Sequence, residues 1–177
     1  MRKFIWNISE RNSILHFKAK YLTIGHLSGS FKKLRGTVVA GALFEDPEIE
    51  LFIGVSSVET LDTDLNRKIK SAAILDAVGY PDLMFASAGG CRASSGVIWE
   101  LEGTFTVKQY SSTVNMIVNF SDLKVKGKRT EALFHLFGTV DLVKSGLGEL
   151  RDKGVAEIIS VNAEIYLLKA DECFAEQ

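Results

Sequence analysis

Apolar and polar residues alternate along most of this chain, which is the period-two pattern of β-strands with one buried face. The first clear example is residues 15–21, whose apolar positions share one face while a histidine and two lysines share the other. Residues 49–55 follow the same rule except at Phe52, which stands on the otherwise polar face. Further segments of this kind are residues 83–87, 99–108, 114–120 and 159–167.

One segment departs from this alternation and predicts a helix over residues 63–78. Its apolar residues recur at helical spacing, and Asp62, Thr63 or Asp64 can cap the first turn. Gly79 and Pro81 then end it. Residues 133–143 are apolar but less regular, and they predict a strand that runs into a short helix within 140–150.

About eight strands at close spacing predict a mainly β fold, either a closed antiparallel barrel or a sandwich. The glycine- and serine-rich residues 89–96, around Cys91, predict a long turn. At 177 residues, with no linker or repeat, a single domain spanning 1–177 is expected.

Charge and composition limit the kinds of partner that the chain is expected to bind. The chain has 21 Lys and Arg against 22 Asp and Glu, so it lacks the basic excess of a nucleic-acid-binding module. No apolar run is long enough to predict a transmembrane segment, and the N-terminal residues do not resemble a secretory signal. A cytoplasmic protein is therefore expected, unless a leader has been removed. Cys91 and Cys173 do not form a disulfide framework.

Candidate chemical groups are sparse. His16, His26 and His135 have no cysteine or carboxylate at metal-ligand spacing. Glu100 and Glu102 share one strand face, but they are expected to face water opposite Trp99 and Leu101. The sequence therefore predicts neither a catalytic residue nor a metal or cofactor.

Several short motifs follow one another along nearly the whole chain. They are Trp6-Asn7-Ile8, Gly29-Ser30-Phe31, Val55 to Thr60, Tyr80-Pro81-Asp82-Leu83-Met84-Phe85, Gly103-Thr104-Phe105-Thr106-Val107 and Phe137-Gly138. In this order and spacing they resemble the YceI-like family, the lipocalin-like polyisoprenoid-binding proteins. The chain departs from the family pattern at Tyr21, where a His is usual, at Asn66-Arg67-Lys68-Ile69, and at Phe134, where an Arg is usual.

The resemblance implies a lipocalin-like extended antiparallel β-barrel of about eight strands, with one α-helix inserted near residues 63–78. It also implies non-enzymatic binding of a long apolar molecule, such as an isoprenoid, a quinone, a polyprenyl phosphate or a fatty amide, inside the barrel. Some members dimerise, and Phe52 on a polar face adds to the expectation of a homodimer.

The predicted ligand-binding residues are the inward apolar positions together with two polar positions near the mouth. They are Leu15, Phe17, Ala19, Tyr21, Ile53, Val55, Ser57, Phe85, Trp99, Leu101, Phe105, Met116, Val118 and Phe120. Thr60 and Arg67 are further polar candidates at the mouth, although both suit turn and capping positions equally well.

Two interpretations of the apolar set remain open: a solid core, or the wall of a ligand tunnel. Under the first, the chain is a structural or interaction protein that keeps the fold without a cavity. A third hypothesis, an enzyme acting on an apolar substrate, lacks an acid–base or nucleophile arrangement.

Overall fold

The computed structural model describes residues 2–22, 25–88 and 91–170. The described chain is mainly β, with short helices between strands. Its elements are β1 (Phe4–Ile8), β2 (Ile14–Tyr21), β3 (Gly25–Phe31), β4 (Leu34–Ala40), β5 (Glu48–Gly54), the 3-10 helix η1 (Val55–Ser57), β6 (Val58–Glu59), α1 (Thr63–Lys70), β7 (Asp82–Ala88), β8 (Cys91–Ser95), β9 (Ile98–Val107), β10 (Tyr110–Lys126), β11 (Arg129–Asp141), α2 (Glu149–Asp152) and β12 (Ile158–Lys169).

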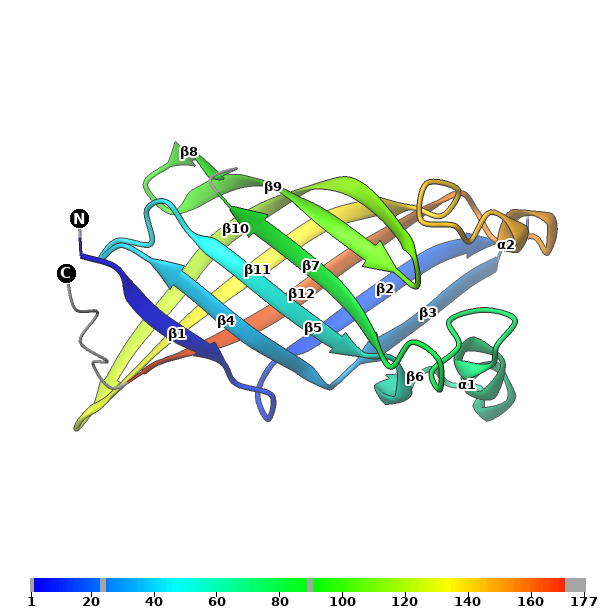
Figure 1. Cartoon of the computed structure of the whole chain (residues 1–177), viewed down its shortest axis with the longest axis horizontal. Coiled ribbons are helices and arrows are strands. Elements are labelled where there is room, and N and C mark those ends of the chain that lie inside the picture. The colour runs from blue at the N-terminus through cyan, green and yellow to red at the C-terminus, as the bar shows by residue number, and fades with distance from the viewer. Residues whose placement is uncertain (1, 23–24, 89–90, 171–177) are drawn as a thin grey trace.

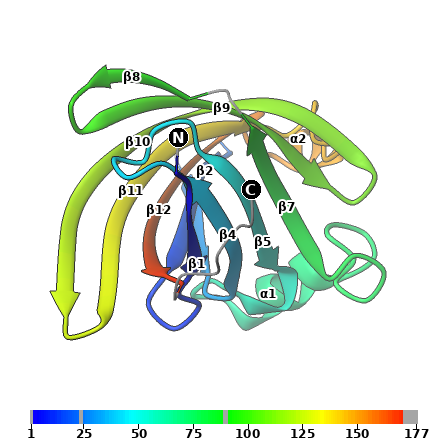
Figure 2. The same ribbon diagram turned by 60° about the vertical axis from the view of Figure 1, so that its left-hand side comes forward.

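Eight antiparallel strands close into a barrel in the order β1-β4-β5-β7-β9-β10-β11-β12, and β12 pairs back onto β1 (Figures 1 and 2). The remaining pairings lengthen this barrel. Along β12, residues 167–169 pair with β1 and residues 160–164 pair with β2, so β1 and β2 follow each other along one edge. The predicted lipocalin-like barrel of about eight strands is confirmed, and the sandwich alternative is excluded.

The two helices lie at the same end of the elongated barrel, whereas β1 starts at the opposite end (Figure 1). The strand β8 pairs only with β9 and continues the sheet beyond the point where β7 leaves β9. Among the described residues, no helix has the length and apolar character needed to cross a bilayer.

The inserted helix is shorter than the predicted 63–78. Asp62 caps its start, because the Asp62 Oδ1 accepts hydrogen bonds from the backbone N–H groups of Asp64 and Leu65 at 2.8 and 3.2 Å. Helix α1 ends at Lys70. The carbonyl groups of its last turn accept hydrogen bonds from backbone N–H groups of residues that lie beyond the helix. The apolar spacing continues into the turns after Ser71, and this misled the sequence-based prediction.

Two other boundaries also differ from expectation. The predicted long turn over residues 89–96 is wrong at Cys91–Ser95, because this backbone pairs with β9 as strand β8. The helix predicted within 140–150 is confined to Glu149–Asp152, and residues 142–146 form turns instead. Residues 89–90 and Cys173 lie outside the described residues.

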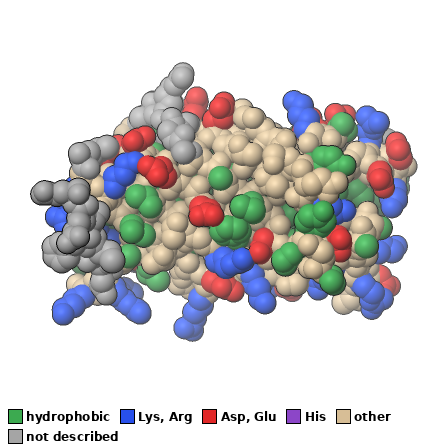
Figure 3. Space-filling view, in the orientation of Figure 1, with side chains coloured by type: hydrophobic (Ala, Val, Ile, Leu, Met, Phe, Trp, Pro, Cys, Tyr) green, Lys and Arg blue, Asp and Glu red, His purple; other side chains and the backbone are tan. Residues whose placement is uncertain are grey.

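The inward faces of the strands form the main core. Leu34, Val55 and Leu101 are among its most deeply buried side chains. Glu100 and Glu102 point outward and are exposed, as predicted. Acidic and basic side chains are intermixed over the face of the molecule shown in Figure 3.

The unusual position of Phe52 has a local explanation. Its ring is half-buried, and the guanidinium of Arg35 on β4 lies 5.0 Å from its centre. Arg35 reaches past this ring to Asp82 on β7 and forms two hydrogen bonds of 2.8 and 2.7 Å. Phe52 therefore packs within its own sheet, and the homodimer stays a prediction.

The Arg35–Asp82 pair makes a prediction about acid stability. Hydrogen bonding to Arg35 lowers the pKa of Asp82, and the resulting stabilisation is present above the unfolded-state value near 3.8 and lost as the pH falls below it. Arg35 is half-exposed, so the pair is expected to contribute only about 0.5–1 kcal/mol at pH 7. Urea unfolding should show Asp82→Asn less stable than the wild type at pH 7 and nearly equal to it at pH 2.5. An unchanged difference at both pH values would contradict this assignment.

Candidate functional site

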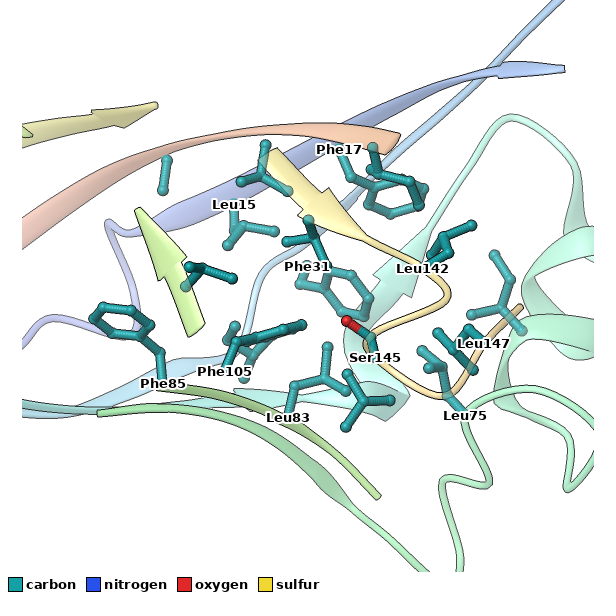
Figure 4. Close-up of a pocket in the computed structure, with 18 of the residues that line it drawn as sticks. Leu15, Phe17, Phe31, Leu75, Leu83, Phe85, Phe105, Leu142, Ser145 and Leu147 are labelled. Atoms are coloured by element: carbon teal, nitrogen blue, oxygen red, sulfur yellow. The ribbon is translucent and has the colours of Figure 1, made fainter. Parts of the chain in front are cut away.

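The interior of the barrel contains an apolar cavity of about 210 Å³. Strands from all around the barrel contribute to its lining, and the segments between strands close it at the helical end. From the α1 side, Leu65, Ile69 and Leu75 face the cavity. From the segment between β11 and α2, Leu142 and Leu147 do so (Figure 4). We call this space the first cavity.

A second apolar cavity of about 80 Å³ lies further along the barrel. Aromatic side chains fill much of the interior there. The ring of Phe134 lies 4.7 Å from that of Phe44, 5.5 Å from that of Phe120 and 6.1 Å from that of Trp99. Phe134 therefore lies at the centre of an aromatic cluster.

Three side chains, Leu51, Phe85 and Leu136, line both cavities and form the partition between them. The Phe85 ring lies against Gly103 of β9, where even a Cβ atom would overlap it. The missing side chain of Gly103 therefore leaves room for the Phe85 ring. The ring lies flat on the neighbouring strand instead of crossing the whole interior.

The predicted ligand-binding residues divide into three groups. Six line the first cavity: Leu15, Phe17, Ile53, Phe85, Phe105 and Met116. Phe85 also lines the second cavity, together with Trp99, Leu101 and Val118. The structure thus brings nine of the predicted residues to the interior space.

The other five predicted residues lie outside both cavities. Val55 is fully buried in the core, Ala19 packs in a small cluster beside the barrel end, and Phe120 belongs to the aromatic cluster. Tyr21 is exposed. Ser57 holds a turn: its hydroxyl donates to the Gly54 carbonyl at 2.7 Å and accepts from two backbone N–H groups.

The further polar candidates at the mouth also have structural roles. The Asn66 Oδ1 accepts hydrogen bonds from the backbone N–H and the hydroxyl of Thr60, at 2.8 and 2.6 Å. Arg67 is exposed and pairs with Asp64 one turn earlier at 3.1 Å. Neither side chain lines a cavity.

Sequence reasoning missed the cavity residues contributed by segments between strands. Leu142, Ser145 and Leu147 lie in a stretch with no alternation, and only the closure of the barrel places them in the interior. Ser145 is the one polar side chain among the described residues that line the first cavity. No described Lys, Arg, His, Asp or Glu lines either cavity, and the surface of the first cavity is apolar, because the oxygen of Ser145 is buried behind it.

Fold and interior together define a lipocalin-like barrel with an apolar cavity. The family model of the YceI-like domain matches residues 6–167, and the chain belongs to this family. A search among curated proteins finds no match.

Solved structures of the same fold include BcnA from Burkholderia cenocepacia, at 20% identity over 90% of this chain and 98% of that chain, with a TM-score of 0.74. The YCEI protein of Campylobacter jejuni is 18% identical over 86% of this chain and 90% of that chain, also with a TM-score of 0.74. A polyisoprenoid-binding domain from Saccharophagus degradans is 13% identical over 94% and 99% of the two chains, with a TM-score of 0.71. At these identities the likeness establishes the fold alone.

The partition can be tested by removing its aromatic ring. Phe85→Ala should join the two cavities and lower the free energy of unfolding by about 3–5 kcal/mol. Phe31→Ala is a matched control, because Phe31 is equally buried but lines the first cavity only. Both variants should lose similar stability in urea unfolding, whereas a crystal structure should show one continuous cavity only for Phe85→Ala. Two separate cavities in that variant would contradict the assignment of Phe85 to the partition.

Proposed function

We propose that this protein binds or carries a long apolar molecule of the isoprenoid, quinone or fatty amide type inside its barrel, without catalysing a reaction. The observation that carries the proposal is the first cavity, about 210 Å³ of interior space with an apolar surface. Membership of the YceI-like family and the shared fold with a polyisoprenoid-binding domain support it.

The size of the cavities bears on the length of the ligand. An engineered apolar cavity of about 150 Å³ binds benzene, so by proportion the first cavity suits about eight carbon atoms. At roughly 0.8 kcal/mol per buried CH₂, eight carbons contribute about 6 kcal/mol, near the lower end of the ~4–15 kcal/mol cost of association. Tight binding therefore requires a longer chain, and a longer chain must displace the partition and enter the second cavity.

The surroundings of the cavity favour binding over catalysis. A catalytic site normally holds titratable groups whose pKa values are shifted by their surroundings. Among the described residues, the groups with shifted pKa values are Lys3, Arg35 and Asp82, which form ion pairs on the outer surface. The lone hydroxyl of Ser145 has no base beside it among the described residues that line the first cavity.

The direct test is to extract the purified protein with organic solvent and to compare native mass spectra before and after extraction. An apolar molecule should copurify and leave on extraction. If neither copurifying molecules nor added C8–C20 alcohols and amides bind, the alternative of a structural protein without a ligand replaces this proposal.

A cavity-filling substitution tests whether binding takes place in the first cavity. Ala163 on β12 is 4% exposed and lines this cavity, so Ala163→Leu should occupy part of it. Displacement of the fluorescent probe N-phenyl-1-naphthylamine should show at least fivefold weaker binding of dodecanol, with stability within about 1.5 kcal/mol of the wild type.

Asn162→Leu is the matched control, because Asn162 is the neighbouring residue on β12 and faces outward. It adds the same side chain to the exposed face and should leave dodecanol binding unchanged. Equal weakening in both variants would show that binding depends on the surface of the barrel instead of on its interior.

A further inference from the structure

The hairpin formed by β10 and β11 projects beyond the barrel at the end opposite the helices (Figures 1 and 2). Its outer part starts after a bulge between Phe120 and Asp122 and includes residues 121–129, all of which are exposed to solvent. The two strands stay paired as far as Lys126 and Arg129, but this part of the hairpin lies outside the core. We call residues 121–131 the projecting hairpin.

A tight turn orders the tip of the projecting hairpin. Gly127 and Lys128 are the two residues between the last strand pair. Gly127 has a φ of 60°, which suits glycine at the first position of a two-residue hairpin loop. A two-stranded ribbon is only marginally stable when nothing packs against it. The tip is therefore regular in geometry, yet it gains nothing from packing within the described chain.

Charge is unevenly distributed here. The projecting hairpin carries four basic and two acidic side chains, whereas the whole chain has a formal net charge of −1. The Asp122 carboxylate is already paired, since it lies 3.4 Å from the Lys124 ammonium. Lys126, Lys128 and Arg129 form no ion pair within the described chain. Figure 3 shows basic side chains at the lower left, where the hairpin projects in Figure 1.

Two apolar side chains are exposed on the same hairpin. Leu123 and Val125 are 49% and 67% exposed, and they share one face of β10 because they are two residues apart. Lys124 and Lys126 take the other face. The strand register places Ala132, which is fully buried, opposite Leu123. The apolar face of the hairpin thus continues from the interior of the barrel out into solvent.

This combination fits the surface of an anionic bilayer better than a nucleic acid. Cations near an anionic leaflet strengthen binding, and aliphatic side chains gain by entering the headgroup region. The stems of lysine and arginine can lie against that apolar layer while their charged ends reach the phosphates. Proteins that bind single-stranded nucleic acids use aromatic side chains on which bases stack, and the projecting hairpin has none.

We propose that the projecting hairpin docks this protein on the surface of an anionic lipid bilayer. Lys126, Lys128 and Arg129 bind headgroup phosphates, and Leu123 and Val125 enter the apolar side of the headgroup layer. None of these residues lines a cavity. The docking goes beyond the proposed function and does not depend on which molecule the barrel binds, or on whether it binds one.

Sedimentation with sucrose-loaded vesicles measures the docking. Vesicles of three parts phosphatidylcholine to one part phosphatidylglycerol are compared with vesicles of phosphatidylcholine alone, at up to about 10 mM accessible lipid. In low salt (about 25 mM NaCl), wild-type protein should bind the anionic vesicles at least tenfold more tightly, because each cation near an anionic leaflet strengthens binding about fivefold. The difference should disappear at about 500 mM NaCl, since salt screens exposed charges.

The first variant removes the three unpaired cations. Lys126→Gln/Lys128→Gln/Arg129→Gln should weaken binding to the anionic vesicles by about tenfold or more, because three favourable contacts with the leaflet are lost. Circular dichroism should show that the β-rich fold is kept, since all three side chains are exposed.

The matched control is Lys18→Gln/Lys20→Gln/Lys68→Gln. These lysines are also exposed, and they lie on β2 and α1, away from the projecting hairpin (Figure 1). The control changes the net charge of the protein by the same amount, but it should weaken binding by less than about threefold, because screening confines the effect of a charge to its surroundings.

A second variant removes the exposed apolar side chains. Leu123→Ser/Val125→Ser should weaken binding to the anionic vesicles about fivefold, because less apolar surface enters the headgroup layer. The matched control is Ile117→Ser/Phe137→Ser. Ile117 and Phe137 face each other across β10 and β11 on the outer face of the barrel and are 52% and 49% exposed. This control should leave vesicle binding unchanged.

Two outcomes would overturn the docking. In the first, wild-type protein does not bind the anionic vesicles. Loss of binding to a single-stranded oligonucleotide, or loss of self-association in light scattering, in the hairpin variants would then identify a nucleic acid or a second copy of the chain as the partner. In the second, each hairpin variant and its control weaken vesicle binding equally, which would assign binding to overall charge or to the barrel surface. The solvent-extraction test reports on the interior of the barrel, so the two proposals can fail separately.

Discussion

Closure of the eight-stranded sheet is the constraint on which the rest of the structure depends. Every strand contributes alternate side chains to one shared interior, and a barrel of this size is wide enough either to be filled by them or to hold one small ligand. The sizes of individual inward-facing residues decide whether the interior is filled or contains a cavity. Gly103 admits the ring of Phe85, and Gly138 admits the side chain of Met116, so large residues lie flat along the sheet and leave space at the centre.

The amount of free space in the interior consequently differs along the length of the barrel. Around Phe134, four aromatic rings pack against one another and leave only about 80 Å³. Towards the helices, mainly aliphatic side chains leave about 210 Å³. With Phe134 at its centre, this half of the interior is apolar as well as crowded.

The strands could be predicted from the sequence because alternation records directly which face of a strand is buried. Leu15, Phe105 and Met116 were assigned to the interior on that basis, and they line the first cavity. The same pattern does not distinguish lining from core: Val55 and Phe120 alternate equally well, yet the structure packs both against other side chains.

The remaining features depend on contacts between distant segments, which alternation does not report. Ser145 occupies a turn without periodicity, and Leu142 in the same turn joins a buried cluster with Ala19, which precedes it by more than 100 residues. The early end of α1 at Lys70 was missed for the same reason. The apolar residues beyond it continue the helical spacing, but they lie in turns that cover the barrel.

The distribution of rigid and adjustable parts indicates how a ligand could enter. Each barrel strand is held by ladder hydrogen bonds on both sides, so opening the sheet would break many of them together. The helical end is closed differently, by Leu65, Ile69 and Leu75 on one segment and by Leu142 and Leu147 on another. These segments connect strands and have no ladder pairing with each other in the described chain. Separating them costs apolar contact but little hydrogen bonding, and a long apolar ligand would restore that contact from within. Opening the helical end therefore breaks fewer hydrogen bonds than opening the sheet.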